Sequence, residues 1–287
     1  MLISTAIAVM VMCGILAAEL IIEGQRDRRL KWPYDDLVPG SYLAKTGLPV
    51  AAIAVALVAS VKGRLAIFAT VFAVTVFVFT MLTGERVNTL IVIAGGILAG
   101  LVWKPNLLRI GAFLVGLICA FIGVLLIFPD SGARYISNFI EHLPTGAHSP
   151  YYRAMMPAWL AFEQAPWLGI GTGNFRNMCL DIIAARPILG QNLDCPPHPH
   201  NFYLQILGET GIIGFVFGSV FLGSLVWLCF KVGRAMHGNV VLATAWVIPF
   251  AFFWPIASSS DFFGQWNNIF IWSGVALAMG AVHSRQP

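Results

Sequence analysis

Long apolar runs separated by short polar connections dominate the chain. A helix needs about twenty apolar residues to cross the bilayer core, and a search for such runs predicts eight spans. They cover approximately residues 2–22, 41–61, 65–83, 87–103, 107–128, 201–230, 239–257 and 267–284. No strand-like alternation is visible, so the backbone hydrogen bonds inside the bilayer must be closed within helices. We therefore predict an all-α polytopic membrane protein with about eight transmembrane helices.

One long polar segment interrupts this pattern and defines three regions. Residues 1–128 are predicted to hold five transmembrane helices with a basic external loop at 23–40, residues 129–199 a large external loop domain, and residues 200–287 three transmembrane helices. Within the loop domain, apolar residues between 151 and 169 recur near helical spacing. We expect short amphipathic helices lying on the membrane surface, with Trp159 and Trp167 at the interface.

Composition supports the membrane assignment. The chain is 58% hydrophobic and 10% charged, whereas soluble domains carry about 25% charged residues. Placing residues 129–199 outside puts most of the loop cations inside, as the positive-inside rule requires. These cations are Lys62, Arg64, Lys104, Arg109, Lys231, Arg234 and Arg285.

The loop at residues 23–40 breaks that rule, because it would hold four cations outside. They are Arg26, Arg28, Arg29 and Lys31. One interpretation is that the topology is wrong, and another is that these cations are kept outside to bind an anion. A third is that helices further upstream set the orientation regardless of this loop.

Two histidines stand together just before the sixth span, in the sequence PPHPHN. Cys195, His198 and His200 are three potential zinc ligands, but no complementary Cys/His cluster exists elsewhere, so metal binding is not favoured. A histidine at the junction of loop and helix suits a general base, because its pKa lies near neutrality. Asn201 has a simpler interpretation as a helix N-cap.

Two arginines are candidates for binding phosphate. Arg86 lies at the outer edge of the third span, where a guanidinium can bind a lipid-linked phosphate through two hydrogen bonds. Arg153 begins the amphipathic stretch of the loop domain. The alternatives are an ordinary interfacial connection for Arg86 and solvated surface charge for Arg153.

Two further features of the loop domain are local. The sequence GIGTGNF (169–175) lacks the strand and the Lys-Ser/Thr pair of a phosphate-binding loop, so a tight turn is favoured. Cys179 and Cys195 share the external segment and are predicted to form a disulfide if that side is periplasmic.

Taken in order, four segments resemble the O-antigen ligase and polymerase family of bacterial integral membrane glycosyltransferases. They read RLKWPYDDLVPGSYLAK (29–45), LTGERVNTL (82–90), YRAMMPAWLAFEQAPWLGIGTGNF (152–175) and HPHNFYLQILGETGIIG (198–214). The resemblance implies a GT-C-like enzyme of the bacterial inner membrane with its active site on the periplasmic side. It would move a glycan from undecaprenyl diphosphate to lipid A core.

The resemblance also implies roles for particular residues. Arg86 and Arg153 would be catalytic residues that bind the diphosphate, and His200 would be the general base, with no metal and no cofactor. Substrate binding would extend to His198, Asn201 and the basic loop, namely Arg26, Arg28, Arg29 and Lys31. The expected partners are the lipid-linked donor, lipid A core or a glycan acceptor, and membrane lipids, with no nucleic acid.

Alternatives stay open at this point. A polysaccharide polymerase of the same superfamily would share the three catalytic positions, and a transporter of lipid-linked sugars is a rival from another class. Against the transporter, Glu19 is the main ionisable residue within a span, and it lies near an end. Family members have about a dozen spans, so we expect that upstream helices are missing, and a truncated, inactive form or a non-catalytic scaffold is a further alternative.

Overall fold

The computed structural model describes residues 2–24, 30–32, 39–84, 86–102, 106–128, 149–186, 192–235, 239–255 and 261–283. Every regular element within these ranges is a helix. The chain divides into two compact units. Unit 1 comprises residues 1–136, 226–252 and 270–287, and unit 2 comprises residues 137–225 and 253–269.

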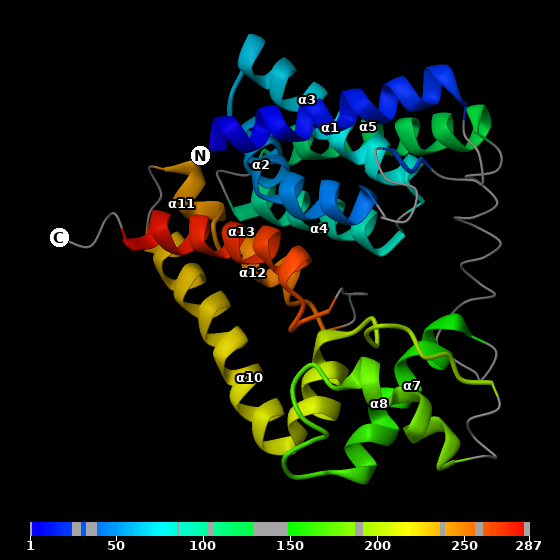
Figure 1. Cartoon of the computed structure of the whole chain (residues 1–287). Helices are drawn as coiled ribbons and strands as arrows, with labels where there is room; N and C mark the ends of the chain where they lie inside the picture. The colour runs from blue at the N-terminus through cyan, green and yellow to red at the C-terminus, as the bar shows by residue number, and fades with distance from the viewer. Residues whose placement is uncertain are drawn as a thin grey trace. The chain divides into compact units, whose positions relative to one another are not determined.

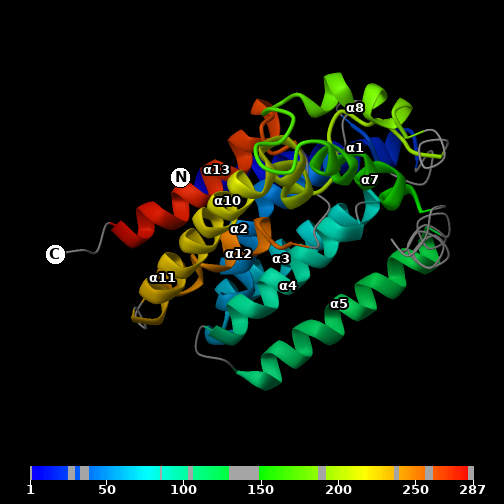
Figure 2. The same cartoon turned by 90° about the horizontal axis from the view of Figure 1, so that it is seen from below.

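Unit 1 is built from the apolar runs of the first half of the chain. Its first five helices are α1 (Leu2–Ile22), α2 (Pro39–Ser60), α3 (Arg64–Leu82), α4 (Arg86–Val102) and α5 (Leu107–Ile127). The central helix is α2, which packs against the other four (Figures 1 and 2). Small residues allow close approach: a Cβ on Gly96 of α4 would lie 3.0 Å from Val55 of α2.

The predicted spans agree with these helices to within a few residues. Five helices are long and apolar enough to cross a bilayer, namely α1, α2, α3, α5 and α10 (Phe202–Ala235), and α4 and α13 (Gln265–His283) contain shorter apolar segments. Together they confirm an all-α polytopic membrane protein.

The seventh predicted span, residues 239–257, is not one continuous helix. It forms α11 (Val240–Thr244) and α12 (Val247–Phe252), which both pack against α2 and α4. Pro249 explains the break, because proline has no N–H to donate to the carbonyl of Ala245. Ile248 N instead donates to Ala245 O at 3.3 Å, so the bond spans three residues rather than the four of an α-helix.

Unit 2 holds the polar part of the chain. Its helices are α7 (Pro150–Gln164), α8 (Phe175–Ala184) and the larger part of α10, as far as Leu225. The helical spacing between residues 151 and 169 therefore predicted α7 correctly. Helices α7 and α8 pack against each other (Figure 1). The predicted disulfide is confirmed: Cys179 of α8 is bonded to Cys195.

A kink at Gly211 divides α10 into two parts. Gly211 has φ 65° and ψ −169°, a conformation that only glycine adopts readily. A Cβ at this position would lie 2.4 Å from the carbonyl carbon of Trp167. Before the kink α10 carries buried polar residues, and after it α10 is almost entirely apolar.

Replacing Gly211 by alanine is therefore expected to destabilise unit 2. The backbone conformation alone costs about 1–3 kcal/mol for a residue with a Cβ, and the clash with Trp167 adds to it. Thermal unfolding of the detergent-purified protein should show a Tm lowered by several degrees. Gly223→Ala is the matched control, because its Cβ would meet nothing within 4 Å in the same helix. Equal melting temperatures for the two variants would contradict the assignment of the kink.

Candidate functional site

The segment that carries the two histidines, residues 192–201, is fixed at both ends. Near its start, Asp194 N donates to the carbonyl of Arg153 at 3.1 Å, and Cys195 is bonded to Cys179. At its end, the Asn201 side chain donates to Pro255 O at 2.8 Å and accepts from Leu204 N at 3.0 Å. The second of these bonds is an N-cap, the simpler of the two interpretations of Asn201.

His200 lies at the end of this fixed segment, in an unusual conformation. Its φ is 56°, and it is the one non-glycine residue with positive φ among the described residues. Such a conformation is uncommon for side chains other than Asn, Asp and His, and strained backbone of this kind collects at functional sites. The His198 and His200 rings meet edge to face, with centroids 4.5 Å apart. The half-buried position lowers the pKa of His200 below its ordinary value of 6.5. His200 is therefore neutral at neutral pH and able to accept a proton.

Arg153 of α7 is linked to the histidine segment by its side chain as well as its backbone. Its guanidinium forms an ion pair with Asp194 at 3.2 Å. The buried Arg153 Nε has no hydrogen-bond partner within the described part of the chain. The structure thus brings Arg153 and the two histidines into one unit and leaves an N–H of the arginine unused.

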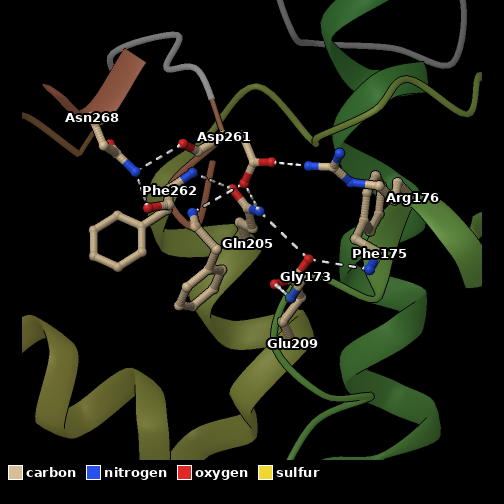
Figure 3. Close-up of polar contacts among 9 residues, drawn as sticks. Gly173, Phe175, Arg176, Gln205, Glu209, Asp261, Phe262 and Asn268 are labelled. Carbon is tan, nitrogen blue, oxygen red and sulfur yellow. Dashed lines mark hydrogen bonds and ion pairs between the residues drawn. The ribbon is translucent and has the colours of Figure 1, made fainter. Parts of the chain in front are cut away.

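The glycine-rich sequence GIGTGNF is a turn whose backbone donors bind a carboxylate of the chain itself. Glu209, only 1% exposed, accepts from Gly173 N at 2.6 Å and from Phe175 N at 3.1 Å (Figure 3). Because Phe175 is the first residue of α8, the Glu209 carboxylate caps that helix and complements its dipole. The turn is further held against α10 by Ile170 N donating to Gly208 O at 3.1 Å. The tight-turn prediction is confirmed.

A second carboxylate, Asp261, joins three segments of unit 2 (Figure 3). The Gln205 side chain donates to Asp261 at 2.6 Å and to Glu209 at 3.4 Å, and accepts from Phe262 N at 2.8 Å. Asp261 also forms an ion pair with the half-exposed Arg176 of α8. Asn268 then donates to the carbonyls of Asp261 and Phe262. This buried network ties the first turns of α10, which follow His200 directly, to α8 and to residues 261–268.

Sequence reasoning missed the members of this network. Gln205 and Glu209 lie four residues apart, hence on one helix face, inside a predicted span. A buried carboxylate in such a place is a functional-site signal by itself. Asp194, the partner of Arg153, was missed because nothing in its local sequence distinguishes it from a solvated acid.

The remaining predicted site residues do not belong to unit 2. Arg86 is the first residue of α4, in unit 1. Lys31 also lies in unit 1, where its backbone N–H donates to both oxygens of Glu19 at 2.8 and 2.9 Å. Arg26, Arg28 and Arg29 lie outside the described residues.

Of the three potential zinc ligands, Cys195, His198 and His200, the cysteine does not have a free thiol. Because Cys195 is bonded to Cys179, its sulfur carries no thiolate for a metal. The two histidines are thus left for proton transfer or substrate binding.

Helices long and apolar enough to span a bilayer define the chain as an integral membrane protein. The family model described as O-antigen ligase matches residues 71–218, just over half of the chain, and this match includes Arg86, Arg153 and His200. The chain belongs to the O-antigen ligase family. At this general level it is a glycosyltransferase-like ligase acting on a lipid-linked glycan donor and an acceptor. No curated protein matches the sequence.

Proposed function

We propose that the chain is an O-antigen ligase-type glycosyltransferase that moves a glycan from undecaprenyl diphosphate to lipid A core. The observation that carries the proposal is His200: a half-buried imidazole with a lowered pKa, held in a left-handed conformation in the segment whose Asp194 binds Arg153. A general base must be neutral and fixed before the acceptor arrives, and His200 meets both conditions.

In the proposed reaction, a hydroxyl oxygen of the acceptor attacks the anomeric carbon of the donor glycan. The bond from that carbon to the diphosphate oxygen breaks, and the electron pair leaves with the polyprenyl diphosphate. His200 takes the hydroxyl proton. Arg153 and Arg86 stabilise the negative charge that develops on the diphosphate, without a metal. Direct attack of this kind inverts the anomeric configuration.

The donor is proposed to be bound by residues beyond the three catalytic ones. His198, Asn201 and the loop cations Arg26, Arg28, Arg29 and Lys31 are proposed to help bind substrate, the cations by attracting the diphosphate. The unused Nε of Arg153 supports this role, because a buried N–H without an acceptor is costly and an anionic ligand would satisfy it.

The site is proposed to face the periplasm, with the protein in the bacterial inner membrane and residues 129–199 as the periplasmic loop domain. The disulfide between Cys179 and Cys195 supports this orientation, because disulfides persist in oxidising compartments. The free cysteines Cys13, Cys119 and Cys229 all lie on other helices, α1, α5 and α10.

Glu19, the main ionisable residue expected within a span, binds backbone groups of its own chain. Its buried carboxylate accepts from the backbone N–H groups of Lys31 and Trp32 at 2.8–2.9 Å. These contacts give the Glu19 side chain a structural role at the end of α1.

The proposed function is tested by complementing a ligase-deficient strain with the chain and separating its lipopolysaccharide on a gel. Glycan attached to purified lipid A core supports the ligase. Restoration of long chains alone, in a strain that still attaches single repeats, would instead identify a polymerase. If the protein is present in the membrane but neither glycan on lipid A core nor long chains are formed, both activities are contradicted.

The lowered pKa of His200 predicts a pH profile. Because only the neutral imidazole accepts a proton, kcat/KM for transfer should be constant at and above neutral pH and fall as the pH drops below 6.5. The measurement is transfer between a purified lipid-linked donor and lipid A core across pH 5–8, in roughly half-unit steps. The residual rate of a His200→Asn variant, the control, should lack this acidic decline. A decline centred above pH 6.5 would contradict a buried, neutral base.

A further inference from the structure

The turn at residues 166–169, between α7 and the glycine-rich sequence, exposes two large apolar side chains. Trp167 is 71% exposed and Leu168 is 73% exposed. Residues 165–175 contain no charged side chain. A soluble surface rarely presents such a pair at the tip of a turn, so this pair needs an apolar partner.

Backbone hydrogen bonds hold this turn beside residues 212 and 213 of α10. Ile212 N donates to Pro166 O at 2.9 Å, and Ile213 N donates to Trp167 O at 3.5 Å. The positive φ of Gly211 brings the two backbones close enough for these bonds. The 166–169 turn therefore sits where the second part of α10 begins.

That position lies at one end of the apolar stretch of α10. Between Glu209 and Lys231 lie 21 residues, 210–230, without a charged side chain. At about 1.5 Å per residue they cover roughly 30 Å, the thickness of the hydrocarbon core. Ile212, Ile213 and Phe217 are exposed apolar residues at the start of this stretch. A bilayer crossed by this stretch would therefore have one boundary close to Ile212, beside the 166–169 turn.

Trp159 of α7, the other tryptophan expected at the interface, has a different environment. Its indole N–H donates to Glu163 at 2.8 Å, and Glu163 also pairs with Arg186 at 3.5 Å. The polar atom of Trp159 is thus already satisfied within the protein, next to an exposed ion pair. The structure therefore distinguishes the two tryptophans.

We propose that the 166–169 turn is a membrane anchor that inserts Trp167 and Leu168 into the outer interfacial layer of the bilayer. The occupant of this apolar surface is lipid, because the surface is continuous with the apolar face of α10. The indole of Trp167 suits the headgroup level, where an apolar ring and a polar N–H are both satisfied. The anchor is independent of the reaction that the protein catalyses.

The test places a fluorescent probe at single positions of the full chain in vesicles of phosphatidylethanolamine and phosphatidylglycerol. Leu168→Cys, Trp159→Cys and Phe217→Cys are made with Cys119→Ala, which removes the exposed free cysteine, and are labelled with an NBD maleimide. Quenching is measured with lipids carrying a doxyl group high on the acyl chain, and separately with aqueous iodide. Phe217→Cys, on the apolar face of α10, is the reference for a site in the bilayer.

The expected result is that doxyl lipid quenches the probe at position 168 severalfold more than the probe at position 159, and that iodide does the reverse. Iodide quenching at 168 equal to that at 159 would overturn the proposal. Protection of position 168 from both quenchers would also overturn it, because a second copy or another protein would then cover the turn. Equal lipid quenching at 159 and 168 would refute the assignment of the anchor to the 166–169 turn.

Discussion

Replacing His200 by asparagine is expected to lower glycan transfer by about 10²–10⁴-fold, the usual contribution of a general base. Asparagine tolerates the left-handed conformation that His200 adopts at φ 56°, so the loop geometry is retained while the base is lost. His200→Ala removes both and should be at least as impaired. The measurement is transfer by the purified protein, or lipopolysaccharide on a gel after complementation, at matched membrane abundance.

His198→Asn is the matched control for this experiment. Its ring meets that of His200 with centroids 4.5 Å apart, so its loss should change orientation and substrate binding more than proton transfer. A raised KM with a smaller fall in kcat is expected. Full activity of His200→Asn would exclude His200 as the base, and an equal loss of kcat in His198→Asn would assign the role to the pair.

Removing the Glu209 carboxylate is expected to have the largest effect on stability. Glu209→Ala leaves Gly173 N and Phe175 N without their acceptor in a buried place, and removes the longer of the two bonds donated by the Gln205 amide. Each lost partner of this kind costs about 1–3 kcal/mol. Thermal unfolding in detergent should show a large fall in Tm, and the Gly173 and Phe175 amides should exchange faster.

Glu163→Ala is the control for Glu209. Glu163 lies on the exposed face of α7 and pairs with Arg186 at 3.5 Å, and surface pairs of this kind contribute about 0–1 kcal/mol. A Glu209 variant as stable as the Glu163 variant would show that the network is not required for the fold. Glu209→Gln keeps the shape and one acceptor oxygen, and should fall between the two.

The His200 and Glu209 variants distinguish an effect on proton transfer from an effect on the stability of the fold. The segment carrying His200 runs directly into α10, and the first turns of α10 are held to α8 and to residues 261–268 by Gln205 and Glu209. A change in the network should therefore lower stability and activity together. A change at His200 should lower activity alone.

The amino-acid sequence by itself determined the membrane-spanning helices, α7, the Asn201 cap and the pairing of Cys179 with Cys195. These features depend on local causes: the length of an apolar run, the spacing of apolar residues, a side chain capping its own helix, and the presence of two cysteines in one external segment. Where a second local cause competed, the pattern alone was wrong, as at Pro249, which divides the seventh predicted span into α11 and α12.

Only the tertiary structure decided how the site is held together. Glu209 looked like an interruption of an apolar run, and its partners, Gly173 and Phe175, lie 36 and 34 residues away. The acceptor of Arg176, Asp261, is 85 residues away along the chain. A buried carboxylate is stable only where folding brings donors to it, and no local pattern encodes which distant backbone will supply them. The same holds for the kink at Gly211, where the backbone of Trp167 lies against the glycine and leaves no room for a Cβ.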